Sequence, residues 1–173
     1  MHDDPTVVGA QVLLRPATVD DAPVVLEILS RPEVSQWWPG ETLDSLRETL
    51  TSATEHSFLV LEDDRPVGFI QYYEELDPEY RHAGIDVALH PDVHGRGLGT
   101  DAVRTLARHL VAARGHHRLI IDPAAANARA IRCYEKVGFR VVGVMREYER
   151  GADGRFHDGL LMDLLASELD EPA

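Results

Sequence analysis

The stretch HGRGLGTDAV, residues 94–103, places three glycines at alternate positions directly before a helical pattern. From Val103 onward, apolar residues recur at offsets 0, 3, 4, 7 and 8, which predicts an amphipathic helix over residues 99–114. Glycine lets the backbone approach an anion closely, and the N–H groups at a helix N-terminus attract negative charge. The stretch therefore predicts a loop that binds a phosphate-bearing group.

Three phosphate-bearing ligands are compatible with such a loop at first sight. Gly97, Gly99 and Ala102 fit the dinucleotide pattern G-x-G-x-x-A, and Asp122 follows Ala102 by 20 residues. That pattern needs its first glycine directly after a strand, whereas HPDVHGR precedes Gly97, and too few strand–helix units follow. A triphosphate loop is excluded because no Gly-Lys-Ser/Thr triplet follows the glycines. Coenzyme A remains, with Arg96 and Thr100 adding side-chain hydrogen bonds to its pyrophosphate.

Length and composition favour a single globular domain. The chain has 173 residues, of which 44% are hydrophobic, and we expect one domain over residues 1–173 with a core over 10–165 and termini that lean toward disorder. Cys133 is the single cysteine, so an intrachain disulfide is excluded, and we interpret it as buried filler. No apolar run approaches the length of a membrane span, and the acidic start MHDDPTVVGA lacks a signal-peptide pattern. We therefore expect a cytoplasmic protein that does not bind membranes.

The charge balance excludes one class of partner. The chain contains 17 Lys and Arg and 30 Asp and Glu, which gives a net charge of -13. Such a field repels phosphate backbones, so no nucleic-acid partner is expected. The acidity either serves solubility or concentrates a cationic substrate. Among the nine histidines, His90 and His94 lie in a loop interrupted by Pro91, so no metal site is expected.

Hydrophobic periodicity divides the rest of the chain into strands and helices. The patterns predict strands over 11–17, 57–76 (a hairpin), 83–91, 117–123, 139–149 and 155–165, and helices over 18–30, 42–54, 99–114 and 127–138. RPEVSQWWPG, residues 31–40, is expected to be a loop. Asn127 is the predicted N-cap of the last helix and Gly138 its C-terminal stop. This order of elements predicts an α/β (α+β) domain around one mixed sheet.

The combination of VALHPDVHGRGLGTDAV, NARAIRCYEKVGF and this strand layout resembles the GNAT superfamily of acyl-CoA-dependent N-acyltransferases over roughly residues 10–165. RPEVSQWW, PVGFIQYY, GIDVAL, GRGLGT and a later DG are similar, more specifically, to aminoglycoside 6′-N-acetyltransferases. The resemblance implies a mixed sheet of about seven strands flanked by about four helices and splayed at the acetyl-CoA site. His94 departs from the family's usual Gln or Arg at its position.

The resemblance also implies which residues contact acetyl-CoA, the expected co-substrate. Asn127 matches the family's pantetheine contact, and Tyr134 matches a tyrosine near the thioester sulfur. The pantetheine arm is expected between the strands IDVALH and RLIID, with a bulge near Asp86–Leu89 that frees a backbone N–H for the carbonyl oxygen. The full predicted set is Val87, Ala88, Leu89, His94, Gly95, Arg96, Gly97, Leu98, Gly99, Thr100, Asn127, Ala130, Tyr134 and Lys136.

Two residues are candidates for moving protons. Asp86 alternates with Ile85 and Val87, so its side chain faces the opposite way, and it is the candidate base for the acceptor amine. A free Asp titrates near 4, so this role needs a raised pKa or an intervening water. Tyr134 is the candidate acid for the departing thiolate; packing in the core is the alternative reading of its position three residues after Ile131.

Acids and aromatics outside the predicted coenzyme A groove are candidates for the acceptor site. Carboxylates hold ammonium groups, and aromatic rings stack on sugar rings. The candidates are Trp37, Trp38, Tyr73, Glu75, Asp77, Asp86, Asp122 and Asp153, of which Asp122 and Asp153 match positions that hold substrate amines in the aminoglycoside enzymes.

The resemblance thus implies an acetyl-CoA-dependent aminoglycoside 6′-N-acetyltransferase that confers antibiotic resistance and acts as a monomer or homodimer. Its substrate would be a small polycationic amine. One alternative is the same fold acetylating a protein N-terminus, a polyamine or a siderophore precursor. A second alternative is a non-catalytic acyl-CoA-binding module. The presence of Asp86, Asn127 and Tyr134 disfavours this alternative.

Overall fold

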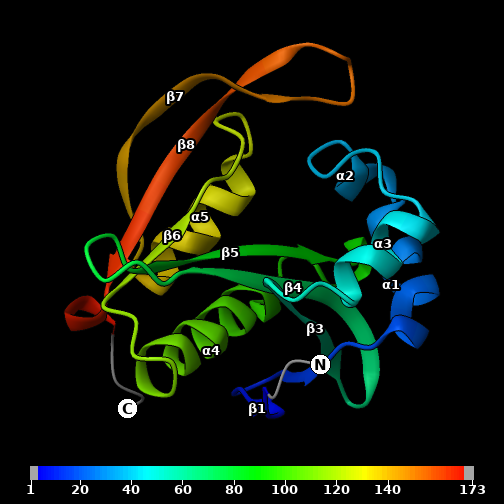
Figure 1. The fold of residues 1–173 in the computed structure, drawn as a ribbon. Coiled ribbons are helices and arrows are strands. Elements are labelled where there is room, and N and C mark those ends of the chain that lie inside the picture. The colour runs from blue at the N-terminus through cyan, green and yellow to red at the C-terminus, as the bar shows by residue number, and fades with distance from the viewer. Residues whose placement is uncertain (1–3, 170–173) are drawn as a thin grey trace.

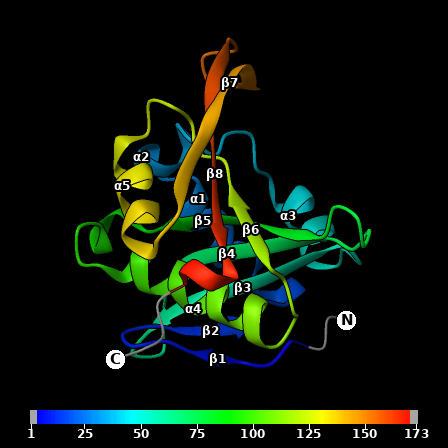
Figure 2. The ribbon, with the colours of Figure 1, turned by 90° about the vertical axis from the view of Figure 1, so that its left-hand side faces the viewer.

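A computed structural model describes residues 4–169 as an eight-stranded mixed sheet with helices on both faces (Figure 1, Figure 2). The strands lie in the order β1-β2-β3-β4-β5-β6-β8-β7, and every pair is antiparallel except β5 with β6. The strands are β1 Val7–Val8, β2 Leu13–Pro16, β3 Glu55–Glu62, β4 Arg65–Glu75, β5 His82–Leu89, β6 Arg118–Ile121, β7 Arg140–Arg150 and β8 Phe156–Leu165. The helices are α1 Ala22–Leu29, α2 Pro32–Ser35, α3 Leu43–Leu50, α4 Leu98–Ala112 and α5 Ala128–Val137.

The predicted mixed α/β class is confirmed, with two additional elements. Val7 and Val8 pair with Leu14 and Leu13, so the N-terminal segment, expected to lean toward disorder, is ordered from residue 4; residues 1–3 and 170–173 lie outside the described part. The predicted loop over residues 31–40 contains the short helix α2. Pro32 begins that helix because its fixed φ suits the first helical position.

Strand alternation gives each face of the sheet its own apolar core. On one face, Ile70, Ile85 and their neighbours pack under α4 and α5. On the other face, Leu59, Phe69 and Ala88 pack against α1 and α3. Asp86 lies between Ile85 and Val87 and therefore projects from the same face as Ala88, toward the side of α1 and α3.

A buried carboxylate joins the β1–β2 turn to α4. The Asp101 side chain is in the first turn of α4, and Asp101 is 5% exposed. Its two oxygens accept hydrogen bonds from the backbone N–H groups of Ala10 (3.2 Å), Gln11 (2.7 Å) and Val12 (3.0 Å). The start of α4, and with it the preceding glycine loop, is thereby fixed to the edge of the sheet.

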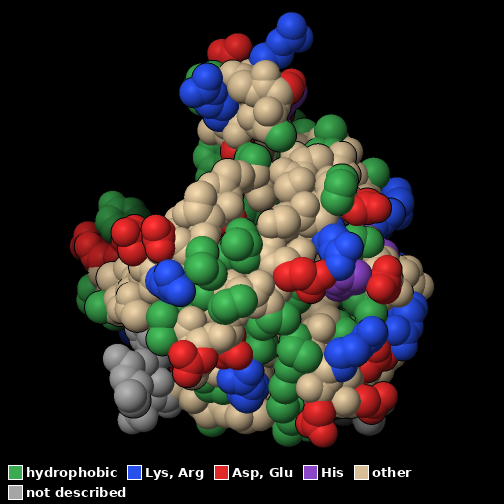
Figure 3. Space-filling model, turned by 90° about the vertical axis from the view of Figure 1, so that its right-hand side faces the viewer, with side chains coloured by type: hydrophobic (Ala, Val, Ile, Leu, Met, Phe, Trp, Pro, Cys, Tyr) green, Lys and Arg blue, Asp and Glu red, His purple; other side chains and the backbone are tan. Residues whose placement is uncertain are grey.

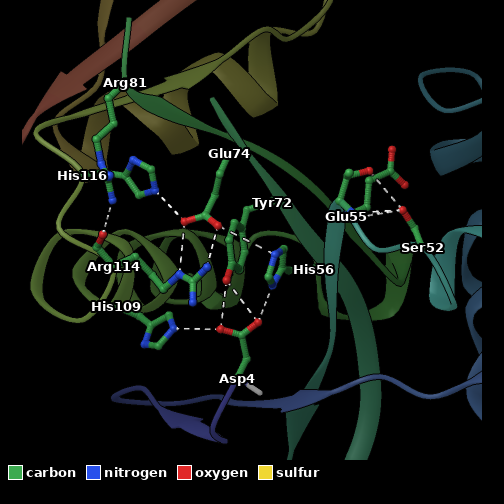
Figure 4. A network of polar contacts seen from close by, with 11 residues as sticks. Asp4, Ser52, Glu55, His56, Tyr72, Glu74, Arg81, His109, Arg114 and His116 are labelled. Carbon is green, nitrogen blue, oxygen red and sulfur yellow. Dashed lines mark hydrogen bonds and ion pairs between the residues drawn. The ribbon is translucent and has the colours of Figure 1, made fainter. Parts of the chain in front are cut away.

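A second polar network lies under the α4 face of the sheet (Figure 4). Asp4 accepts a hydrogen bond from the Tyr72 hydroxyl (2.9 Å), and the side chains of His56 and His109 also contact it. Glu74 pairs with Arg114 at 2.5 Å and with His116 at 2.7 Å. Burial raises the pKa of Glu74, but the hydrogen bonds from Arg114 and His116 outweigh it and hold the pKa at about 2. The network connects β3, β4 and α4 on the face opposite to Asp86.

The sheet splays between its two parallel strands. β5 pairs with β6 only at Ala83↔Leu119 and Gly84↔Ile120, although β5 continues to Leu89. The predicted splay is therefore confirmed. The predicted bulge is wrong, because the β4–β5 ladder runs without a register shift from Gly68↔Leu89 to Glu75↔His82. The free edge of β5 arises from the divergence of β6 instead.

The distal part of the β7–β8 hairpin, residues 146–157, projects beyond the sheet, and we call it the arm. Figure 1 shows the arm extending toward the α2 side, and Figure 3 shows its tip above the rest of the molecule with acidic and basic side chains. Within residues 4–169, the helices are all too short or too polar to cross a membrane.

Candidate active site

A single cleft brings most of the predicted residues together. Its volume is about 1180 Å³, and it is lined by the free edge of β5, the start of α4, one side of α5, the segment around α2 and the arm. Of the predicted coenzyme A residues, all but Arg96 line it. Of the predicted acceptor residues, Trp37, Trp38, Asp86 and Asp122 line it.

The glycine loop ends at the N-terminus of α4. Gly97 is the N-cap residue and has φ +82°, a left-handed conformation that side chains other than glycine's rarely adopt. Gly97 has no side chain to cap the helix, and the first residues of α4, Leu98–Thr100, line the cleft. This end of the cleft offers backbone donors and a positive helix terminus to a phosphate group.

The His94 side chain connects the C-terminal end of β5 to α5. Its Nε2 lies 2.9 Å from the Leu89 carbonyl oxygen and donates to it, while Nδ1 accepts from the Arg129 guanidinium. Burial lowers the pKa of His94, which agrees with a neutral ring in this arrangement. The histidine therefore forms a structural bridge between the β5 edge and α5, at the position where the resemblance implies Gln or Arg.

The free edge of β5 presents backbone hydrogen-bonding groups to the cleft. The His90 N–H bonds to the Val67 carbonyl on the β4 side, and the Leu89 carbonyl points the other way, to His94. Backbone direction alternates along a strand, so the N–H and carbonyl groups of Val87 also face away from β4. An extended amide-bearing chain, such as a pantetheine arm, fits beside this edge.

Basic side chains of α5 line the same end of the cleft. Arg129, Arg132 and Lys136 follow one another at spacings of three and four residues, which places them along one side of the helix. In a chain of net charge -13, this stripe gives this end of the cleft a local positive charge. The geometry of this end therefore fits coenzyme A.

Asp86 lies at the opposite end of the cleft among other acids. Gln71 Nε2 donates to its Oδ2 at 3.3 Å. Burial, reinforced by the charge of Asp122 and more weakly by Glu55 and Glu149, raises the pKa of Asp86 to about 6. Asp86 therefore has the raised pKa that a general base for an amine requires.

Three residues that line the cleft near Asp86 were not predicted from the sequence. Glu55 begins β3, and Tyr148 and Glu149 belong to the arm; all three line the cleft. The Tyr148 hydroxyl donates to Asp122 Oδ2 at 2.5 Å, and burial together with Asp122 raises the pKa of Glu149. Extending the alternation of β3 by two residues would have placed Glu55 on the face of Leu59, whereas no sequence pattern indicated the arm residues.

Tyr134 lies between the two ends of the cleft. It is 7% exposed and packs edge-on against Phe139, with ring centroids 6.3 Å apart. Burial raises its pKa well above the ordinary value, and the charges of Cys133, Asp86 and Asp122 add to this. The hydroxyl therefore stays protonated at neutral pH. The neighbouring Cys133 Sγ lies 3.4 Å from Thr100 Oγ1, and burial raises the pKa of its thiol.

The two tryptophans have different surroundings. Trp38 packs against Phe69, with ring centroids 5.9 Å apart, and its Nε1 donates to Glu41 at 3.1 Å, so it supports the core under α3. Trp37 also lines the cleft. Trp37 is therefore the better placed of the pair to contact an acceptor.

The remaining predicted residues lie outside the cleft lining, each for a local reason. Arg96 pairs with Glu62 at 2.5 Å. Glu75 and Asp77 accept hydrogen bonds from backbone N–H groups of their own exposed β4–β5 loop. Asp153 is at the tip of the arm and pairs with His157 at 2.9 Å. Tyr73 borders the acceptor end closely enough that Asp122 and Asp86 add to burial in raising its pKa.

Comparisons with known proteins agree with this geometry. Residues 11–140 match the Acetyltransferase (GNAT) domain family. The aminoglycoside N(6')-acetyltransferase type 1 of Klebsiella pneumoniae is 34% identical over 155 residues, covering 78% of this chain and 76% of that protein.

Two solved structures have the same fold. The RimJ protein of Mycobacterium smegmatis in complex with CoA-disulfide superposes with a TM-score of 0.85 at 23% identity, covering 99% of this chain and 93% of that one. Aminoglycoside acetyltransferase AAC(6')-Ib in complex with coenzyme A and kanamycin superposes with a TM-score of 0.75 at 29% identity, covering 91% and 96%. The chain belongs to the GNAT acetyltransferase family, and it is an N-acetyltransferase that uses acetyl-CoA.

Proposed function

We propose that this enzyme acetylates the 6′-amine of an aminoglycoside and so confers resistance to such antibiotics. The observation that supports the proposal is the acceptor end of the cleft, where Asp86 is surrounded by Glu55, Asp122 and Glu149. Three carboxylates beside one candidate base suit an acceptor with several ammonium groups better than one with a single amine. The similarity to a named aminoglycoside 6′-acetyltransferase supports the same acceptor.

Asp86 serves as the base in the proposed reaction. Acetyl-CoA supplies the acetyl group as a thioester, and the acceptor must present a neutral amine to it. With a pKa of about 6, the Asp86 carboxylate is ionised at neutral pH yet basic enough to accept the proton of the amine. The neighbouring carboxylates keep the other ammonium groups of the acceptor charged and bound.

Two further groups of the chain stabilise the charge that develops during transfer. The Val87 N–H, on the free edge of β5, is directed into the cleft and donates to the thioester carbonyl oxygen. The Tyr134 hydroxyl retains its proton at neutral pH and donates to the departing thiolate. Arg129, Arg132, Lys136 and the start of α4 hold the phosphates.

An acceptor panel tests the proposal directly. Release of free thiol from acetyl-CoA is measured with kanamycin, with an analogue that carries a 6′-hydroxyl in place of the 6′-amine, with spermidine and with a short peptide. We expect turnover with kanamycin and at least about 100-fold lower kcat/KM with the 6′-hydroxyl analogue, about 3 kcal/mol of transition-state free energy. Turnover confined to spermidine or to the peptide would contradict the aminoglycoside proposal and identify the acceptor class instead.

The pKa of Asp86 predicts the acid limb of the pH profile. Because Asp86 must be ionised to accept a proton, kcat/KM for the acceptor should fall about tenfold per pH unit below pH 6. The limb is measured by initial rates between pH 4.5 and 7.5 at saturating acetyl-CoA. In Asp86→Glu, whose carboxyl has a higher ordinary pKa, the limb should move toward higher pH. A profile that is flat across pH 6 would contradict the base role.

A further inference from the structure

The arm departs from regular strand pairing where it reaches the cleft. Met145 pairs with Gly159 and Glu149 pairs with His157, so residues 146–148 of β7 face the single residue Asp158. Glu147, in the middle of this bulge, has φ +47°, an uncommon conformation for a residue with a side chain. Such backbone conformations cost free energy and persist only when surrounding contacts hold them.

Three contacts hold the bulge in place. Asp158 Oδ1 accepts from the Glu147 N–H at 2.9 Å, and the Asp158 carbonyl accepts from the Ala125 N–H at 2.9 Å. The ring of Tyr148 packs on Gly159, where a Cβ atom would come within 2.7 Å of it. The bulge and the glycine together let Tyr148 turn inward from the arm toward the end of β6.

The bulge determines what Tyr148 and Glu149 do. Regular alternation from Val144 would not bring two successive residues of β7 to the cleft, yet both line it. The Tyr148 hydroxyl meets Asp122 Oδ2 at 2.5 Å, a short hydrogen bond to a charged acceptor. Asp122 follows β6 at the point where β6 leaves β5, and it is the acid with the largest effect on Asp86.

We propose that Tyr148 is a positioning residue for the acceptor: its hydroxyl fixes the Asp122 carboxylate in the cleft beside Asp86. The proposal rests on the proposed function, since it concerns the binding of a cationic amine beside Asp86. Tyr148 acts through Asp122 and touches no reacting atom. The bulge at residues 146–148 is thereby a specificity-determining feature of the arm, and its side chains set the affinity for the acceptor.

Kinetics of Tyr148→Phe and Asp122→Asn, alone and together, test the proposal. Loss of the hydroxyl frees the Asp122 side chain, so we expect Tyr148→Phe to raise the KM for kanamycin about tenfold, with kcat changed by less than about threefold. In the Asp122→Asn background the same change should alter KM by less than about twofold, because the charge that the hydroxyl positions is already removed. The dissociation constant of coenzyme A, measured by calorimetry, should stay unchanged. Phe156→Ala, an exposed aromatic on the same arm outside the cleft lining, is the matched control.

A spectroscopic measurement tests the contact independently of turnover. The hydrogen bond to Asp122, followed by burial, raises the pKa of Tyr148 above its ordinary value. In the free protein, the ring carbon that bears the Tyr148 hydroxyl should therefore titrate at lower pH in Asp122→Asn than in the wild type, as observed by NMR. An unchanged titration, an unchanged kanamycin KM in Tyr148→Phe, or equal effects in both backgrounds would each overturn the proposal. Absence of turnover with kanamycin in the wild type, with the titration shift present, would instead overturn only the proposed function.

Discussion

Asp86→Asn is expected to lower kcat by about 10²- to 10⁴-fold, the range typical of losing a general base. Asparagine preserves the shape of the side chain and a polar contact with Gln71, but it cannot accept the proton of the acceptor amine. The dissociation constant of acetyl-CoA should change by less than about twofold, because the substitution leaves the start of α4 and the basic side chains of α5 that line the cleft unchanged.

The measurement combines initial rates at saturating substrates with calorimetric titration of coenzyme A. Asp44→Asn, which removes an exposed carboxylate from α3, serves as the matched control. A normal kcat in Asp86→Asn would contradict the base role. A parallel loss of coenzyme A affinity would indicate that the substitution disturbs the sheet rather than the chemistry.

Asp101→Ala is expected to lower the free energy of unfolding by about 3 kcal/mol, because three backbone N–H groups lose a charged acceptor in a poorly hydrated position. For a chain of this size, the melting temperature should fall by about 6–12 °C. Asp101→Asn retains one acceptor oxygen and should lose less.

Urea unfolding followed by circular dichroism measures the loss for both variants. Asp92→Ala, an exposed acid in the preceding loop, should change the unfolding free energy by less than about 0.5 kcal/mol. A loss below about 1 kcal/mol in Asp101→Ala would contradict the account of the β1–β2 turn, since it would mean that water satisfies the three N–H groups.

The elements with strong local signals were predictable from the sequence. The helix over α4 follows from its apolar spacing, and α5 begins at Asn127, whose side chain accepts from the Ala130 N–H, and ends at Gly138 with φ +118°. These signals act within a few residues of the chain, so no tertiary information is needed. The residues predicted to contact coenzyme A lie largely on these two helices or directly before them, and all except Arg96 line the cleft.

The acceptor end could be predicted only in part, because it is assembled from strands that are distant in the chain. Strand alternation indicated the direction of the Asp86 side chain, the resemblance indicated Asp122, and both residues line the cleft. Glu149 reaches the cleft only through an irregular bulge, which alternation cannot anticipate. Asp153 and Asp77 do not line the cleft, and each has a local partner on its own exposed turn, which the sequence pattern does not distinguish from a binding acid.

The separation of charge along the cleft bears on how products leave. Under the proposed reaction, the acceptor enters with an ammonium group that Asp86 and its neighbouring carboxylates attract. Acetylation turns that group into a neutral amide, while the proton it loses neutralises the base beside it. The attraction that recruited the acceptor is thus weakened by the reaction itself, so the modified molecule dissociates more readily than its precursor. The same carboxylates thereby favour turnover over product inhibition.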